Sequence, residues 1–243
     1  MTTPGRPAEA RAVALPHTLW ATTLGIYQWA DAPAVNPLLV RVLGALRATA
    51  LPPPGPGAFY ASNDDLLHRV KLPEWQQLVR FIVEGVRSTA AQANQQVWAH
   101  ESGQAPGLQI AIEGMWFQFS NGGAHHDVHT HGNCSWSGVY CVAVDDDTAR
   151  CRHEVFGELN GITRFYGPWF SRLGGAHMDY GSAYLQQAHH DVAPRPGQLV
   201  VFPSWLPHQA MPYQGGQDRL IISFNASVHR AEGGNRTHGY ARG

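Results

Sequence analysis

The sequence predicts a mainly β fold of the α+β class: a double-stranded β-helix core (a jelly-roll or cupin-like barrel) with N-terminal helices packed on one sheet. From about residue 108 onward, short apolar segments follow one another that alternate or run continuously, as strands do. Gly and Pro are frequent, at 26 and 17 residues, which favours turns and short strands over a helical bundle. Short strands separated by such turns are typical of double-sheet barrels.

Two helices are expected before this β-rich part. The first is predicted over about 37–48, because Asn36 suits the cap, Pro37 suits the first helical position, and Leu39, Leu43 and Leu46 share a face. The second begins near Pro73, and its apolar residues recur at helical spacing, so one side is expected to pack on a sheet. These residues are Trp75, Leu78, Val79, Ile82 and Val86.

We interpret the 243 residues as a single domain. Residues 1–13 and 229–243 are expected to be tails, 14–107 a helical support, and 108–228 the barrel core with an insertion at 145–193. The insertion is polar and Gly-rich, and loops at a barrel end usually carry substrate contacts. It contains aromatic residues and an arginine that are candidates for covering a substrate, although packing on the barrel is expected for most: Arg164, Phe165, Tyr166, Trp169, Tyr180 and Tyr184.

Composition excludes several classes of protein. With 44% hydrophobic and 14% charged residues the chain is globular, and a formal net charge of -1 makes no electrostatic case for nucleic acid or an anionic membrane as partner. No segment has the apolar length of a signal peptide or a membrane span, so we expect a cytoplasmic protein. Cys134, Cys141 and Cys151 are odd in number and lack CxxC spacing, which argues against a disulfide framework or a zinc ribbon.

The most informative segment is the histidine-rich strand AHHDVHTHGN at 124–133. Strict alternation along a strand places His125, Asp127, His129 and His131 on one face. Side chains at i and i+2 are roughly 6–7 Å apart at their roots and can converge on one metal ion. Positions 125 and 131 are about 20 Å apart on an extended strand, so all four cannot serve one site.

A third ligand is predicted far downstream. The segment PSWLPH, ending at His208, closes a strongly apolar strand, and ten residues intervene before Arg219. A ligand on a distant strand, followed by an arginine on the next, is the layout of a mononuclear iron oxygenase in which the arginine pairs with the distal carboxylate of 2-oxoglutarate. A guanidinium suits this role because it stays charged and binds a carboxylate through two parallel hydrogen bonds.

Three ordered motifs, HTHGNCSWSGVYCV, GQLVVFPSWLPHQAMPY and DRLIISFN, resemble a family of 2-oxoglutarate/iron(II)-dependent oxygenases. ASNDDLLHRVKLPEWQQLVRFI also resembles that family's N-terminal helical region, so the resemblance covers most of the chain. The sequence departs from the family pattern at Gly132, where Pro is expected, at Cys141, where Tyr is expected, and in the 145–193 insertion. These departures leave the metal site intact but bear on the identity of the substrate.

The resemblance implies a function and a set of site residues. It implies His129, His131 and His208 as the iron ligands and catalytic centre, Arg219 as the anchor of 2-oxoglutarate, and Tyr140 and Ser223 as further cosubstrate contacts. Trp205 and Asn225 also match the motifs, with packing and strand-end hydrogen bonding as an equally simple role. The expected reaction oxidises a small-molecule or peptide substrate with molecular oxygen and releases succinate and CO2.

Alternatives remain open at this point. His125 and Asp127 form a rival His-x-Asp pair on the same predicted strand face, and mixed pairs such as Asp127 with His129 are conceivable. The preference for His129 and His131 depends on the motif and on Gly132-Asn133 marking the strand end. The function also has alternatives: a three-histidine cupin dioxygenase that does not use 2-oxoglutarate, and a non-catalytic metal-binding jelly-roll module. A halogenase is disfavoured because a histidine in the carboxylate position leaves no vacant site for chloride.

Overall fold

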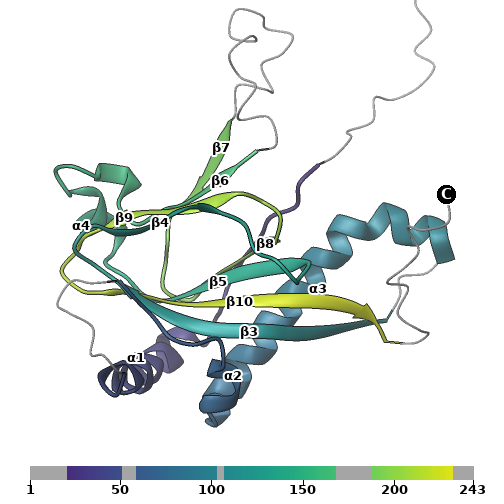
Figure 1. Cartoon of the computed structure of the whole chain (residues 1–243), viewed down its shortest axis with the longest axis horizontal. Helices are drawn as coiled ribbons and strands as arrows, with labels where there is room; N and C mark the ends of the chain where they lie inside the picture. Colours follow the sequence, from purple (N-terminus) through teal and green to yellow (C-terminus); the bar gives the residue numbers. More distant parts are fainter. Residues whose placement is uncertain (1–20, 51–58, 103–106, 168–187, 232–243) are drawn as a thin grey trace, which may run out of the picture.

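A computed structural model describes residues 21–50, 59–102, 107–167 and 188–231. Two β-sheets face each other and enclose the space in which the candidate site lies (Figure 1). The predicted double-stranded β-helix is confirmed by this architecture. The expected tail at 1–13, nearly all of the tail at 229–243, and Trp169, Tyr180 and Tyr184 lie outside the described residues.

The larger sheet has six strands in the order β1-β8-β5-β10-β3-β2. Its long central strands pair antiparallel, and β10 lies between β3 and β5 over most of its length. The bounds are β1 Gly25–Gln28, β2 Tyr60–Ala61, β3 Leu108–Ser120, β5 Trp136–Ala143, β8 Gln198–Pro203 and β10 Arg219–Arg230.

The smaller sheet has four strands in the order β4-β9-β6-β7. Its strands come from three separate parts of the chain, and β9 in the middle continues into β10 of the larger sheet through the turn at 214–218. This connection brings the beginning of β10 under the smaller sheet. The bounds are β4 Ala124–His129, β6 Thr163–Tyr166, β7 His189–Val192 and β9 His208–Tyr213.

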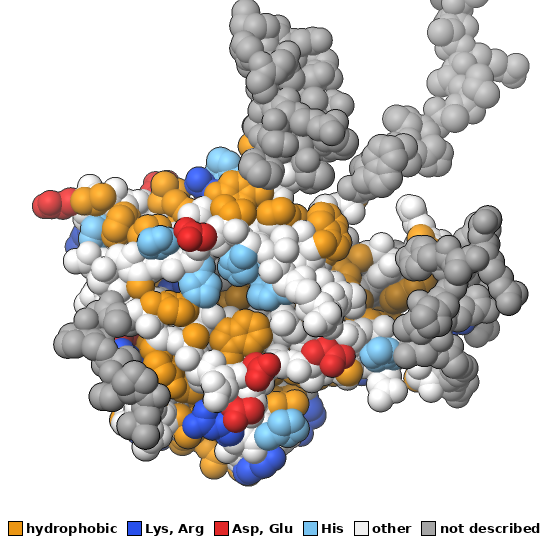
Figure 2. Space-filling model, viewed as in Figure 1, with side chains coloured by type: hydrophobic (Ala, Val, Ile, Leu, Met, Phe, Trp, Pro, Cys, Tyr) orange, Lys and Arg blue, Asp and Glu red, His pale blue; other side chains and the backbone are white. Residues whose placement is uncertain are grey.

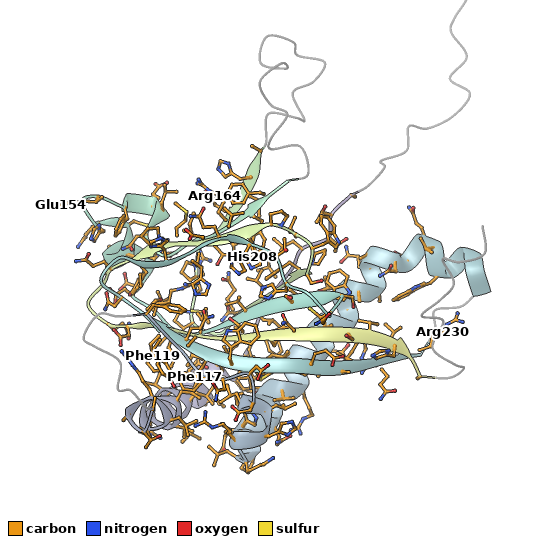
Figure 3. All side chains as sticks on the ribbon, viewed as in Figure 1. Phe117, Phe119, Glu154, Arg164, His208 and Arg230 are labelled. Carbon is orange, nitrogen blue, oxygen red and sulfur yellow. The ribbon has the colours of Figure 1, made fainter. Side chains whose placement is uncertain are left out.

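Helices α1 (Ala32–Ala48) and α3 (Pro73–Ser102) cover the outer face of the six-stranded sheet, as predicted (Figure 1). The short helix α2 (Leu66–Arg69) precedes α3. Of the apolar positions predicted for α3, four are buried and Val79 is partly buried, because a period of 3.6 residues gathers them on the side facing the sheet. Phe117 and Phe119 on β3 contribute to the same core from the sheet side (Figure 3).

The predicted start of the first helix is wrong by five residues. Helix α1 begins at Ala32 after Asp31, and Pro37 lies inside it. Asn36 does not cap the helix. Its amide donates to the Val142 carbonyl at 2.8 Å, and its side-chain oxygen accepts from the Tyr140 hydroxyl at 2.8 Å. The residue read as a cap thus fastens the helix to β5.

The insertion predicted at 145–193 contains the short helix α4 (Asp147–Cys151), the 3₁₀ turn η1 (Gly157–Leu159), and strands β6 and β7. Phe165 packs in a buried cluster, Arg164 pairs with Asp191 at 2.7 Å, and the Tyr166 hydroxyl donates to the Gln209 side chain at 2.7 Å. The three members of the aromatic and arginine set that are described therefore have structural contacts. In the described part of the chain, no helix combines the length and apolar character needed to cross a membrane.

Candidate functional site

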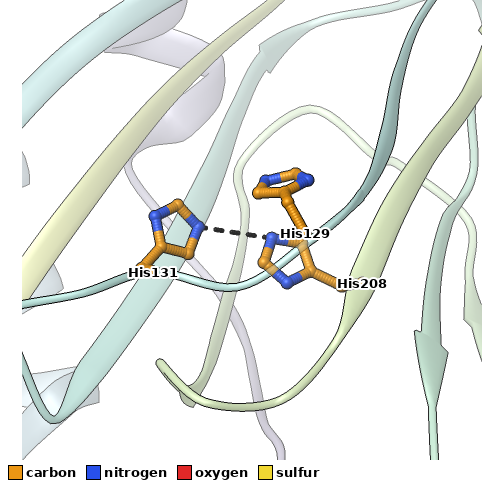
Figure 4. A group of neighbouring side chains, drawn as sticks. All are labelled: His129, His131 and His208. Carbon is orange, nitrogen blue, oxygen red and sulfur yellow. Dashed lines mark hydrogen bonds between the residues drawn. The ribbon is translucent and has the colours of Figure 1, made fainter.

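Three histidines converge between the two sheets (Figure 4). One ligand atom from each of His129, His131 and His208 lies within 4.8 Å of the others. The Nε2 atoms of His131 and His208 are 3.3 Å apart. The rings of His129 and His208 have centroids 4.3 Å apart. Three imidazoles so arranged offer one face of a coordination sphere to a single cation.

Strand pairing holds two of these histidines and a loop holds the third. His129 at the end of β4 is the direct partner of His208 at the beginning of β9. His131 lies just beyond β4, and its backbone N–H donates to the Ser204 carbonyl at 2.9 Å. Asn133 follows with a φ of +56°, the left-handed conformation that an asparagine tolerates better than most residues. The chain therefore turns away immediately after presenting its second imidazole.

Backbone carbonyls set the tautomers of two of the rings. The Nδ1–H of His208 donates to the Leu206 carbonyl at 3.0 Å, and the Nδ1–H of His129 donates to the Asp127 carbonyl at 2.7 Å. A carbonyl oxygen only accepts, so each Nδ1 carries the hydrogen and each Nε2 keeps its lone pair. The lone pair at Nε2 is what a metal ion requires.

Burial favours the neutral form of two of the three imidazoles. Desolvation, helped by nearby His129 and His126, lowers the pKa of His131 to about 4. Desolvation lowers the pKa of His208 to about 3, outweighing the Leu206 carbonyl, which acts in the opposite direction. Neutral imidazoles bind a divalent metal without first releasing a proton. Their nitrogen donors suit a first-row cation, and three ligands on one side leave positions for other molecules. The residues thus fit an iron(II) ion.

The predicted alternation along the histidine strand is wrong in its first half. His126 lines the central cavity, whereas the Asp127 side chain is 97% exposed and that of His125 is 50% exposed. The register between β4 and β9 shifts between Ala124 and His126 and again between His126 and His129. Each shift adds a residue on one strand and reverses which side chains face inward. His125 and Asp127 are therefore not brought to the three-histidine group.

A cavity of about 440 Å³ connects the histidines with Arg219. Figure 2 shows several histidine side chains gathered around a hollow on the viewed face. Arg219 begins β10, is 4% exposed, and its Nε atom has no hydrogen-bond partner among the described residues. Burial lowers the pKa of its guanidinium. A buried guanidinium that faces a cavity fits the carboxylate of a ligand.

The two further residues predicted to contact the cosubstrate, Tyr140 and Ser223, do not both face the cavity. Ser223 is 5% exposed and lines the cavity on the same face of β10 as Arg219. Tyr140 does not face this cavity: its fully buried ring belongs to the core beneath the helices, where its hydroxyl bonds Asn36. The prediction that Tyr140 contacts the cosubstrate is thus corrected. Its neighbour Val139 lines the cavity instead, because successive side chains of β5 point to opposite faces.

Several other residues of the cavity wall were not predicted from the sequence. Trp116 lies beside the metal group, with its ring centroid 6.1 Å from that of His131. Alternation along β3 indicates that Trp116 and Gln118 share a face, but not that this face is the cavity. Further wall residues are Ser62, Asp64, His126, Thr163, Ala210 and Ile221. Of the motif residues with a simple structural role, Asn225 accepts a hydrogen bond from Ser137 at 2.9 Å, and Trp205 is 55% exposed.

The barrel matches a known enzyme family. Residues 114–225 match the profile of the family described as "Putative 2OG-Fe(II) oxygenase". This segment includes all three histidines and Arg219. Among curated proteins, none matches the sequence.

Solved structures with the same fold include enzymes of this type. The non-heme alpha-ketoglutarate-dependent epimerase SnoN from nogalamycin biosynthesis has a TM-score of 0.52 and 13% identity, over 87% of this chain and 79% of SnoN. A prolyl hydroxylase from Trichoplax adhaerens, in complex with a fragment of hypoxia inducible factor, has a TM-score of 0.50 and 9% identity, over 84% and 83%. AviO1 from Streptomyces viridochromogenes has a TM-score of 0.50 and 15% identity, over 87% and 93%. At such identities the likeness shows the fold.

Proposed function

We propose that the chain is a 2-oxoglutarate/iron(II)-dependent oxygenase, and we assign the residues that bind the metal and the cosubstrate; the family match over residues 114–225 supports this proposal. His129, His131 and His208 hold the iron. Arg219 binds the distal carboxylate of 2-oxoglutarate, with Ser223 as a further polar contact. The observation that carries this assignment is that one cavity joins the three imidazoles to a buried guanidinium.

The bound iron would supply the redox chemistry that couples decarboxylation of 2-oxoglutarate, with release of succinate and CO2, to oxidation of the substrate by molecular oxygen. The chain's own contribution is to bind and orient. The Leu206 and Asp127 carbonyls hold two imidazoles in the tautomer that ligates. The buried guanidinium positions the cosubstrate.

The ligand set differs from the two-histidine, one-carboxylate arrangement that is usual for such oxygenases. A neutral imidazole in place of a carboxylate raises the net charge of the metal centre by one unit. This change is expected to alter the affinity for the metal and the oxidation potential, while the number of open positions stays the same. The same three histidines suit a dioxygenase that does not use 2-oxoglutarate, and Arg219 is the observation that favours 2-oxoglutarate over that alternative.

The substrate is proposed to be a small molecule or a peptide side chain that enters beside Trp116. The cavity volume of about 440 Å³ is within the range of small-molecule sites. Trp116 offers an apolar surface next to the metal group, and Ser62 and Asp64 offer polar contacts on the same wall. Similar folds serve both kinds of substrate: SnoN is named for a biosynthetic epimerisation, and the prolyl hydroxylase is in complex with a peptide fragment.

An anaerobic titration tests the proposed function. Addition of 2-oxoglutarate to the iron(II)-loaded protein is expected to produce a saturable charge-transfer absorption. Arg219→Met should retain iron but weaken 2-oxoglutarate binding by roughly tenfold or more, because a hydrogen-bonded charge pair is lost. Arg47→Met is the matched control. The Arg47 guanidinium forms an ion pair with Asp218 at 2.7 Å, and Asp218 directly precedes Arg219, but Arg47 does not line the cavity. Absence of the absorption in the wild-type protein would contradict the proposal and favour the alternative without 2-oxoglutarate.

A further inference from the structure

Gln118 on β3 is a buried polar residue that the function has not used. Its side chain is 8% exposed and lines the cavity. In the described part of the chain no hydrogen bond to its carboxamide is found, and its amide atoms are not among the fully buried ones that lack a partner, so the carboxamide is accessible from the cavity. A carboxamide that faces a cavity offers two N–H donors and a carbonyl acceptor to whatever binds there. The cavity is the place from which a partner can come.

The register of the sheet gives the depth of Gln118 in the cavity. Trp116 is paired with Ser223, Gln118 with Ile221, and Ser120 with Arg219. Consecutive pairs on one face are roughly 6.8 Å apart along the strands. Trp116 is beside the metal group, so Gln118 is one step deeper, and the backbone of Arg219 is one step deeper again.

The surroundings of Gln118 at that depth are apolar. Ile221 is its direct partner on β10, and Cys141 is the partner of Ile221 on β5. Burial raises the pKa of the Cys141 thiol to about 12, so the thiol is neutral at physiological pH. Among the paired residues Gln118, Ile221 and Cys141, Gln118 is therefore the one with a strong hydrogen-bond donor, and it lies between the three histidines and Arg219 along the strands.

We propose that Gln118 is a cosubstrate-binding residue, whose carboxamide N–H donates to the carboxylate of the 2-oxo acid end of 2-oxoglutarate. This inference rests on the proposed function. A 2-oxo acid held at the histidines would present a carboxylate that the protein would have to satisfy with a hydrogen-bond donor. Arg219 is occupied by the other carboxylate, and Gln118 is the nearer of the two to the histidines along the strands. Ligand and amide thus satisfy each other in a buried site.

Two ligands and three proteins test this assignment. The iron(II)-loaded wild-type protein, Gln118→Met and Arg219→Met are each titrated anaerobically with 2-oxoglutarate and with pyruvate, and the Kd is taken from the charge-transfer absorption. Pyruvate retains the 2-oxo acid but lacks the distal carboxylate. Methionine is close to glutamine in length and volume and makes no strong hydrogen bond. Thermal unfolding of each protein checks that the variants are folded.

The expected result is that Gln118→Met raises the Kd of both ligands by a similar factor, roughly tenfold, because a hydrogen bond to a charged group is lost. Arg219→Met should raise the Kd of 2-oxoglutarate and leave that of pyruvate unchanged. If Gln118→Met affects 2-oxoglutarate alone, Gln118 contacts the distal carboxylate and the assignment is overturned. Unchanged binding of both ligands overturns it as well.

A second variant covers the case in which Gln118→Met does not fold. Gln118→Glu has nearly the same shape and places a carboxylate against the ligand's carboxylate, so it should weaken both ligands more than methionine does. Equal or tighter binding by Gln118→Glu would overturn the assignment. If the wild-type protein binds neither ligand, the proposed function itself fails. If the wild-type protein binds both ligands and a Gln118 variant binds them equally well, only the assignment of Gln118 fails.

Discussion

The Nε2 atoms of His131 and His208 lie 3.3 Å apart, although 77 positions separate the two residues in the sequence. Their rings are nearly parallel, with an interplanar angle of 16°. Two imidazoles at this distance cannot both be protonated without strong repulsion, and burial already disfavours the charged form. The pair is thus held in the state that a metal ion requires, and this state has measurable consequences.

The ligand set is tested by a pair of alanine variants. His131→Ala should weaken iron(II) binding by more than roughly 10–100-fold, which is typical when a residue that is hydrogen-bonded to a metal ligand is lost. Asp127→Ala should bind iron(II) like the wild-type protein, because the Asp127 side chain is 97% exposed and outside the group. Metal content after equilibrium dialysis is the measurement. Loss of iron in Asp127→Ala with retention in His131→Ala would reverse the assignment.

Acid should destabilise the metal-free protein in a defined pH range. The folded-state pKa is about 4 for His131 and about 3 for His208, against a usual value of 6.5 that both regain on unfolding. The unfolded chain therefore binds more protons between pH 6.5 and about 3. The free energy of unfolding is expected to be unaffected by these groups above pH 6.5 and to fall as the pH is lowered through this range.

Urea denaturation of the metal-free protein at several pH values measures this effect. His208→Gln should reduce the dependence of unfolding free energy on pH, since one of the two buried imidazoles is gone. His189→Gln is the matched control, because His189 is exposed on β7. Equal pH dependence in the wild-type protein and His208→Gln would show that the buried cluster does not cause the acid sensitivity.

Tyr140 is expected to matter for stability and not for the cosubstrate. Tyr140→Phe removes the 2.8 Å hydrogen bond to Asn36 and leaves that buried side-chain oxygen unsatisfied. The free energy of unfolding should fall by about 0.5–1.5 kcal/mol. The Kd of 2-oxoglutarate should be unchanged, because the ring faces the helices. A tenfold rise in this Kd at unchanged stability would restore Tyr140 as a cosubstrate contact.

Gly138 is predicted to tolerate no side chain. A Cβ at this position would lie 2.7 Å from the Val200 carbonyl oxygen and closer still to the Phe224 ring. Gly138→Ala should therefore destabilise the sheet by about 1–3 kcal/mol or more through overpacking. Gly132→Ala is the control, because a Cβ there meets nothing within 4 Å. Thermal unfolding compares the two variants, and an equal effect at both positions would contradict the steric explanation.

Much of the architecture could be predicted from local patterns. Apolar residues at helical spacing after Pro73 mark helix α3, because its buried face is determined by a period within one segment. The succession of short apolar strands and turns is enough to predict a barrel of two sheets. The histidines of the motif, His129, His131 and His208, lie around one cavity with Arg219. The end of β4 pairs with the beginning of β9, and β10 follows β9 directly along the chain.

The tertiary structure alone decided which side chains of each strand face that cavity. His126 faces inward and Asp127 outward because two register shifts against β9 reverse the alternation, and such shifts depend on the partner strand. Both faces of β5 are apolar, so its pattern cannot tell that Tyr140 packs under the helices while Val139 lines the cavity. Residue types and spacing therefore determined the kind of site in this protein, and long-range strand pairing determined its members.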